Sequence, residues 1–311
     1  MAFRLKLREP VADGIVRIGR EQLREAAAAL AEGTGRATAV HDARKCLKRL
    51  RALVSAAQPG LGRRTYRDIR ACISTAARRL GPTREAAVMR QTLARLADHY
   101  DLPPAGAVGR VGAALKSPRA LDEAVAVASA RPALDRLAKA FEQLVFEKLT
   151  LDDIAAAMGA VLATGRHRFE RAFDTGDDEA MHDWRKVVQL HWRHMALVSD
   201  AWPDAFQVRI ETAKRLSHLA GEDNDLATLV RAVAAPAAKF REVDRAVIVA
   251  ICRVRQGELR RITRPLGERL FAIDAAALDR TIVAAWRTAP LLQASESKSS
   301  VASGQIVTLV Q

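Results

Sequence analysis

Residues 41–45 read His-Asp-Ala-Arg-Lys, and residues 182–186 read His-Asp-Trp-Arg-Lys, 141 positions later. Each copy stands near the start of a helical pattern that has apolar residues on one side and His and basic residues on the other. In the first copy the apolar positions from Val40 to Ala57 recur at steps of three and four, as on the buried side of an amphipathic helix. The opposite side of each helix therefore presents cations, which favours an anionic partner.

A second pair of matching segments indicates an internal repeat. Residues 80–85 read Leu-Gly-Pro-Thr-Arg-Glu, and residues 221–226 read Gly-Glu-Asp-Asn-Asp-Leu at nearly the same offset. Each segment is predicted to end one helix and to open the next. We expect its glycine in the left-handed position after a helix, and Pro82 in the first turn of the following one. Two anchors at nearly equal offsets predict duplicated halves.

The composition indicates a helical protein with a polyanionic partner. The chain has 311 residues, of which 49% are hydrophobic and 5% aromatic, and no convincing strand alternation precedes the last few residues. Its net charge is +14, and most of the excess lies in the first 100 residues. Such a concentration of positive charge predicts a phosphate-rich polyanion as partner, although the same charge also serves solubility.

Turn residues divide the chain into four parts. Residues 1–100 are predicted to form a first helical-bundle repeat, 101–130 a connection with short helices, 131–289 a second helical-bundle repeat and 290–311 a flexible tail. The expected helices of the first repeat cover 11–30, the residues around His41 as far as Pro59, 61–80 and 82–100. Those of the second repeat cover 132–149, 151–173, the residues around His182, 203–220, 222–234, 236–262 and 274–288.

Basic side chains recur at helical spacing on four of these helices. They are His41, Arg44, Lys45, Lys48, Arg49 and Arg51; Arg63, Arg67, Arg70 and Arg78; His182, Arg185, Lys186 and Arg193; and Lys214, Arg215 and His218. Arginine forks hold two phosphate oxygens at once, and lysines act as compact point charges. A helical stripe of them can follow the successive phosphates of a polymer. For the last three residues an ordinary solvated face is an equal alternative, because Glu211 is nearby.

The histidines and acids of the repeat have alternative roles. His41 and His182 either donate to phosphate when protonated or pack, neutral, at a seam between bundles. Asp42 and Asp183 are expected to orient a neighbour, pair with an arginine or serve the first helical turn. His191 falls on the apolar side of its helix and is expected to be a core residue rather than a metal ligand. We expect neither catalytic residues nor a cofactor.

The cysteines and the N-terminal residues indicate the cellular compartment in which we expect the protein. The three cysteines are too few and too scattered for a disulfide framework or a zinc knuckle, which favours a reducing interior. The first ten residues lack the apolar core of a signal peptide. No run approaches the roughly 20 apolar residues that span a membrane. The expectation is a cytoplasmic protein.

Taken in order, these motifs resemble the CHAD family, the conserved histidine α-helical domain. The resemblance rests on the repeated His-Asp-x-Arg-Lys helix, on the Gly-x-x-(Arg/Asn)-(Glu/Asp) turn about 40 residues later, and on residues 3–5 leading into residues 15–18. It implies an all-α fold in which two pseudo-symmetric four-helix bundles form one unit with a basic central surface or pore. It also implies binding of inorganic polyphosphate and, often, association with polyphosphate granules.

Some members of that family carry a CYTH domain ahead of the CHAD region, with an alternating Glu-x-Glu-x-Lys strand near its start. No such strand occurs here, so the chain resembles a stand-alone member. Two positions depart from the family pattern. Glu85 stands where an aspartate is usual, and Gln189 stands where the first repeat has a basic residue. These departures bear on how much the second half contributes to binding.

Three classes of function are compatible with the sequence. The first, which we expect, is non-enzymatic binding of inorganic polyphosphate through basic helix faces, with targeting to polyphosphate granules. The second is binding of nucleic acid or of polyanions in general. Aromatic residues that could stack on bases are scarce, and there is no recognisable helix-turn-helix or other nucleic-acid recognition motif, which disfavours nucleic acid. The third is a metal-dependent phosphohydrolase built on the His-Asp dyads. It is disfavoured because Arg44 and Lys45 crowd the dyad with positive charge.

Overall fold

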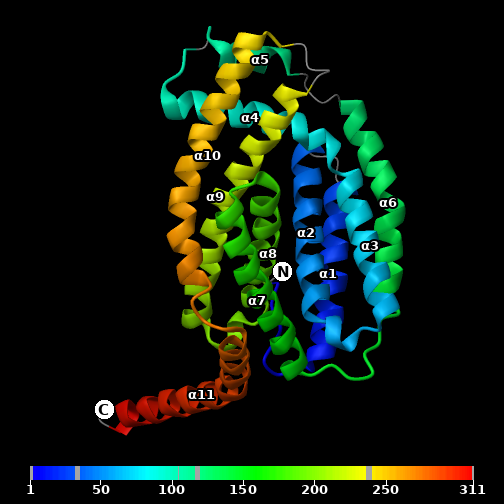
Figure 1. Cartoon of the computed structure of the whole chain (residues 1–311). Coiled ribbons are helices and arrows are strands. Elements are labelled where there is room, and N and C mark those ends of the chain that lie inside the picture. Colours follow the sequence, from blue (N-terminus) through cyan, green and yellow to red (C-terminus); the bar gives the residue numbers. More distant parts are fainter. Residues whose placement is uncertain (1–2, 32–35, 104, 116–119, 236–239, 310–311) are drawn as a thin grey trace.

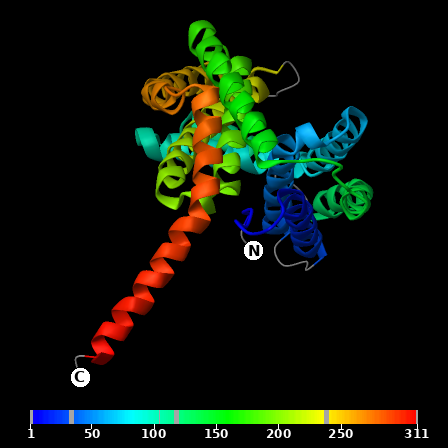
Figure 2. The same cartoon turned by 90° about the horizontal axis from the view of Figure 1, so that it is seen from below.

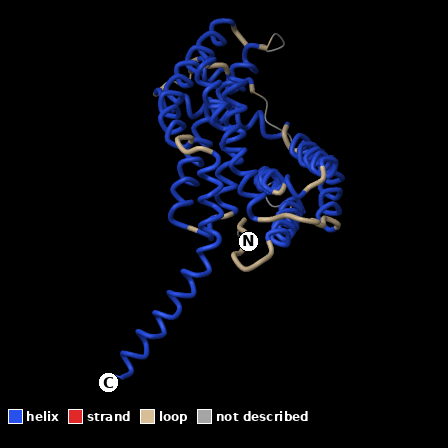
Figure 3. The backbone as a smooth tube through the Cα atoms, turned by 60° about the horizontal axis from the view of Figure 1, so that its bottom comes forward, coloured by secondary structure: helices blue, strands red, loops and turns tan. Residues whose placement is uncertain are grey.

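The computed structural model describes residues 3–31, 36–103, 105–115, 120–235 and 240–309. All regular elements among these residues are helical, which confirms the all-α class (Figure 1, Figure 3). The α-helices are α1 (Val11–Ala31), α2 (Arg36–Ala56), α3 (Arg63–Arg79), α4 (Pro82–Tyr100), α5 (Ala107–Ala114), α6 (Ala120–Glu142), α7 (Leu151–Thr175), α8 (Asp178–Leu197), α9 (Pro203–Ala234), α10 (Glu242–Leu270) and α11 (Ala275–Leu309). Two short 3-10 helices, η1 (Gln58–Gly60) and η2 (Ser199–Ala201), precede α3 and α9.

Four helices, α1, α2, α3 and α6, form one lobe of the molecule. Helix α1 packs along α2, α3 packs along α6, and α6 also contacts α1 (Figure 1). The packing between α1 and α6 is close, because a Cβ added at Gly19 would lie 2.2 Å from the ring of Phe141. The sequence predicted α4 as the fourth helix of this bundle. In the structure the fourth position is taken by α6, which begins inside the expected connection.

Helices α7, α8, α9 and α10 form the other lobe, with the first part of α11 packed on α7. The side chain of Trp184 is fully buried there, with its ring 5.4 Å from that of Phe169 and 5.6 Å from that of Phe173. Helices α4 and α5 pack against α9 and α10 through a separate apolar cluster. Helix α4 thereby carries the first half of the chain onto the second lobe. The expected pseudo-symmetry of two bundles stays a prediction.

At both glycines of the second motif pair, Gly81 and Gly221, the structure differs from what the sequence predicted. Gly81 ends α3 with φ −79° and ψ −54°, so it does not take the expected left-handed conformation. Gly221 does not end a helix at all, because α9 runs unbroken through it. The expected separate helices at 203–220 and 222–234 are therefore one helix. The turn at Gly176 does have the left-handed backbone, with φ +66° after α7.

Three other expected boundaries also differ. The helix predicted over 132–149 ends at Glu142, and residues 143–150 form a loop before α7, whose capping box joins Thr150 and Asp153. Helix α10 extends to Leu270 rather than stopping at Ile262. The segment expected as a flexible tail continues α11 as far as Leu309, past Pro290. This last part of α11 projects away from both lobes (Figure 2).

The two lobes meet where α2 lies beside α7 and α8 (Figure 1, Figure 2). The buried side chain of His194 in α8 places Nε2 3.0 Å from the carbonyl oxygen of Ala52 in α2. The N-terminal segment adds a second link, because the amide of Leu5 donates to the carbonyl oxygen of Leu197 at 2.9 Å. Among the described residues, no helix combines the length and apolarity needed to cross a membrane. At the α2–α8 seam the two helices that carry the copies of the repeated motif pack against each other.

Candidate anion-binding site

Arginines from both lobes gather at the α2–α8 seam. Arg49 and Arg51 come from α2, and Arg185 and Arg193 come from α8; we call these four residues the arginine cluster. Arg193 experiences the charges of the other three. The amphipathic pattern of each helix accounts for their positions, since apolar neighbours such as Leu50 and Val188 are fully buried in their own lobes. The cluster brings together cations that the sequence places 140 residues apart.

Arg193 is the most buried member of the cluster, with 6% of its surface exposed. Its Nη1 donates to the carbonyl oxygen of Gln189 at 2.7 Å, whereas its Nε has no hydrogen-bond partner. Burial, together with the charges of Arg49, Arg185 and Arg51, lowers the pKa of Arg193 to about 9. The side chain is thus still a cation at neutral pH, in a place where no described carboxylate pairs with it.

Arg51 extends the cluster towards α3. Burial and the charge of Arg70 lower its pKa, and Arg51 makes no hydrogen bond or ion pair with any described residue. Arg70 contacts Tyr66, with Nη1 3.2 Å from the hydroxyl oxygen and the guanidinium 5.4 Å from the ring centre. Arg49 differs from Arg51, because it donates to Gln22 and lies 3.4 Å from Glu25. Within the described part of the chain, Arg51 and Arg193 are therefore the members of the cluster that no carboxylate neutralises.

The remaining basic positions of α3 continue outward from Arg70 along the exposed side of the helix. Arg63, Arg67 and Arg78 are exposed, and none of them forms an ion pair within the described part of the chain. Arg78 contacts the Thr75 hydroxyl at 3.5 Å. The structure thus supports the expected one-signed stripe on α3. It places only Arg70 next to the arginine cluster.

Trp192 forms a platform for two cations, which the sequence analysis did not anticipate. The Arg193 guanidinium carbon lies 4.0 Å from the centre of the indole, and Lys214 Nζ of α9 lies 5.4 Å from it. Both contacts fall within the range of a cation–π interaction. No sequence signal connects Trp192 with a lysine 22 positions away. The platform extends the basic surface from α8 to α9.

The motif arginines make equivalent contacts in the two halves. Arg44 Nη1 donates to the carbonyl oxygen of Ala77 at 2.6 Å and lies 3.8 Å from the position of a Cβ on Gly81. Arg185 places Nε and Nη2 3.4 Å from the position of a Cβ on Gly221. In both halves the motif arginine therefore packs beside the glycine of the second motif, at van der Waals distance from the position of a Cβ.

The motif acids and lysines also pair in the same way in both halves. Asp42 lies 3.8 Å from Lys45, and Asp183 lies 2.8 Å from Lys186, one helical turn on in each case. All four side chains are about half exposed, so these ion pairs contribute little to stability. They do reduce the charge that Lys45 and Lys186 offer to an anion. Among the described residues Asp42 has no arginine partner, so the expected pairing of this aspartate with an arginine does not occur.

The two motif histidines have different surroundings. His41 is exposed on α2, whereas His182 is half-buried in α8. Burial and the charges of Lys186 and Arg185 lower the pKa of His182, although Asp183 and a hydrogen bond with Asn224 oppose the shift. His182 is therefore neutral at neutral pH. This favours the packing role for it over the role of a protonated phosphate donor.

The other predicted residues are peripheral to the cluster. Lys48 is half-buried on α2. On α9, Lys214 and Arg215 are exposed, and His218 lies 3.3 Å from Glu222. His191, expected to be a core residue, is fully buried, and Arg209 Nη2 lies 3.3 Å from its Nε2. Within the described residues, no three His, Cys, Asp or Glu side chains could hold a metal ion.

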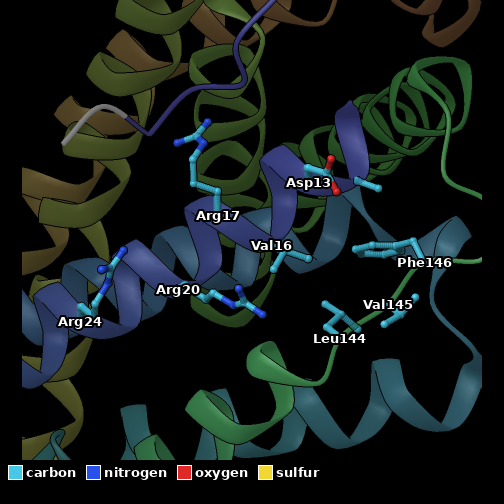
Figure 4. A pocket seen from close by; sticks show the side chains of 9 residues that line it. Asp13, Val16, Arg17, Arg20, Arg24, Leu144, Val145 and Phe146 are labelled. Atoms are coloured by element: carbon cyan, nitrogen blue, oxygen red, sulfur yellow. The ribbon is translucent and has the colours of Figure 1, made fainter. Parts of the chain in front are cut away.

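Three arginines outside the cluster make internal contacts that differ from those of Arg51 and Arg193. Figure 4 shows a groove of about 520 Å³ between α1 and residues 144–146. There Arg17 is bonded to Glu9 and Glu21, and Arg20 donates to two carbonyl oxygens at the end of α6. In α10, Arg260 is paired with Asp223 and Asp178 at 2.8 Å. Unlike Arg17 and Arg260, Arg51 and Arg193 have no acidic partner among the residues that the structure describes.

A comparison with family models identifies the family of the chain. The model of the CHAD domain matches residues 16–234, which include both copies of the motif and the whole α2–α8 seam. The chain belongs to the CHAD family. No significant match was found among curated proteins, and none among solved structures. In this CHAD protein the motif arginines Arg44 and Arg185 each pack beside the glycine of the second motif.

Proposed function

We propose that this CHAD protein binds inorganic polyphosphate at the α2–α8 seam without catalysing its breakdown. The observation that carries the proposal is Arg193, which is buried among three other arginines and has no acidic partner in the described part of the chain. Burying a cation beside like charges is costly unless an anion compensates it. A bound phosphate chain supplies such an anion.

The arrangement of the cations suits a flexible polymer better than a small anion. The arginine cluster continues into Arg70 and the exposed stripe of α3 in one direction, and into the Trp192 platform in the other. A chain with one negative charge per phosphate can contact these groups in succession. Arginine suits this task because its fork holds two oxygens of one phosphate. Association with polyphosphate granules is a further part of the proposal.

The experiment is a titration of the purified protein with long-chain polyphosphate across a salt series, with duplex DNA and orthophosphate as competitors. The proposal expects tight binding that weakens steeply with salt, because counterions are released from the polymer. It also expects that excess duplex DNA does not displace polyphosphate and that no orthophosphate is released. Displacement by DNA at equal charge would instead support a general polyanion surface, and release of orthophosphate would support an enzyme.

A further inference from the structure

Helix α10 has an unusual outer face. Its inner face is buried against α9 and α5 through residues that include Ile248, Cys252 and Leu259. Its outer face lies at the edge of the molecule, and no other helix covers it (Figure 1, Figure 2). The outer face of a peripheral helix in a basic protein is ordinarily charged. This one is apolar over half its length.

The apolar residues of that face lie on one side of the helix. They are Val243, Ala246, Val247, Ala250, Val254 and Gly257, which we call the α10 stripe. Val243 is 54% exposed, Val247 39% and Val254 56%. Gly257 leaves open space, since a Cβ there would have no atom within 4 Å. The stripe is about 20 Å long at 1.5 Å per residue. Contiguous exposed apolar surface of this kind marks an interaction site.

Charged residues stand at the two ends of the stripe and differ in sign. Glu242 precedes it, with a side chain that is 85% exposed and lies 3.6 Å from Arg245 of the same helix. Arg261 and Arg264 follow it and are exposed, and Arg264 lies 3.3 Å from Glu268. Arg253, at the flank of the stripe, is held 2.9 Å from Asp178 of the same chain. In an antiparallel pair of identical helices, Glu242 of each copy lies towards the arginines of the other, whereas a parallel pair brings like charges together.

We propose that α10 pairs antiparallel with α10 of a second copy of this chain, through the α10 stripe. The stripe is self-complementary about Ala250, because Val243 then faces Gly257 of the other copy and Val247 lies beside Val254. A contact of this kind is isologous and closes as a dimer. The contact lies on the far side of α9 and α10 from the arginine cluster and does not depend on polyphosphate binding.

The first test is the mass of the full chain in solution over a concentration series, measured by analytical ultracentrifugation. The wild type is expected to shift from the mass of one chain to that of two as concentration rises. The double variant Val247→Glu/Val254→Glu should remain a single chain at every concentration. Val208→Glu is the matched control, because Val208 is a valine on α9 that is 66% exposed. A wild type that never exceeds one chain, or a dimer that survives in the double variant, overturns the proposal.

The second test determines the orientation of the pair. In a background with Cys72→Ser, Ala250→Cys should form an intermolecular disulfide readily, because position 250 lies opposite itself. Val243→Cys should not, because the two copies of position 243 are then about 20 Å apart. A parallel pair would cross-link both variants, and absence of cross-linking in Ala250→Cys would contradict the proposed register. Reversing the end charges by Glu242→Arg should weaken the dimer, and adding Arg261→Glu/Arg264→Glu should restore it.

Discussion

His194 of α8 and Ala52 of α2 are joined across the seam between the lobes, with Nε2 of the histidine 3.0 Å from the carbonyl oxygen of the alanine. Because the carbonyl can only accept, Nε2 carries the proton and donates. The Nδ1 atom on the other side of the ring is buried without a hydrogen-bond partner. Burial lowers the pKa of His194 to about 4, so the ring is neutral at physiological pH.

This contact predicts that the folded protein loses stability as the pH falls from about 6.5 to about 4. In that window the unfolded chain binds a proton at His194 and the folded chain does not, so the free energy of unfolding falls by up to about 1.4 kcal/mol per pH unit. The variant His194→Gln keeps a donor for Ala52 but does not titrate. Urea unfolding at pH 7 and pH 5 should show a smaller loss in the variant. An equal loss in both proteins would contradict the prediction.

Removing the buried charge at the seam should have opposite effects on stability and binding. We expect Arg193→Met to raise the free energy of unfolding by about 1 kcal/mol at low salt without polyphosphate, because a cation without an acidic partner is removed from buried surroundings. The same change should weaken polyphosphate binding by about tenfold or more and reduce the salt slope by about one. Unfolding curves and the salt titration check both effects. Lower stability with unchanged affinity would assign Arg193 a purely structural role.

Substitutions of two arginines, one in the cluster and one outside it, distinguish a specific binding site from the effect of general surface charge. We expect Arg51→Gln to weaken polyphosphate binding strongly, because this side chain is close to Arg70 and Arg193 and has no described partner. The control is Arg64→Gln, which removes the same charge from an arginine that is 92% exposed and lies 3.9 Å from Asp68. Binding measured at one salt concentration should fall clearly more for Arg51→Gln. Equal losses would mean that net charge alone determines affinity.

The position of α6 in the first lobe can be tested through Gly19. A Cβ at this residue would lie 2.2 Å from the fully buried ring of Phe141. Gly19→Ala should therefore destabilise the fold by about 1–3 kcal/mol, as overpacking does. The control is Gly62→Ala, since a Cβ there would meet no atom within 4 Å. Thermal unfolding of both variants measures the difference, and two equal melting temperatures would place α6 elsewhere.

Local pattern alone was enough to locate most helices, because each turn of an amphipathic helix repeats its apolar positions at short range. The local pattern failed to predict the structure where contacts between residues far apart in the sequence are involved. Gly221 was predicted to end a helix, yet α9 continues through it, and the glycine packs beside the guanidinium of Arg185 from α8. Similarly, local pattern could not assign α6 to the first lobe, because its place depends on the packing of its Phe141 against Gly19 of α1.

The sequence by itself determined the helical class, the family and the two copies of the motif, since all of these are properties of residue type and spacing along one chain. It also singled out each member of the arginine cluster as a basic residue on a helix face. Only the tertiary structure decided which of these cations lack an acidic partner. Whether an arginine is neutralised depends on carboxylates that reach it from other helices, as Asp178 and Asp223 reach Arg260. No such carboxylate reaches Arg51 or Arg193 among the described residues.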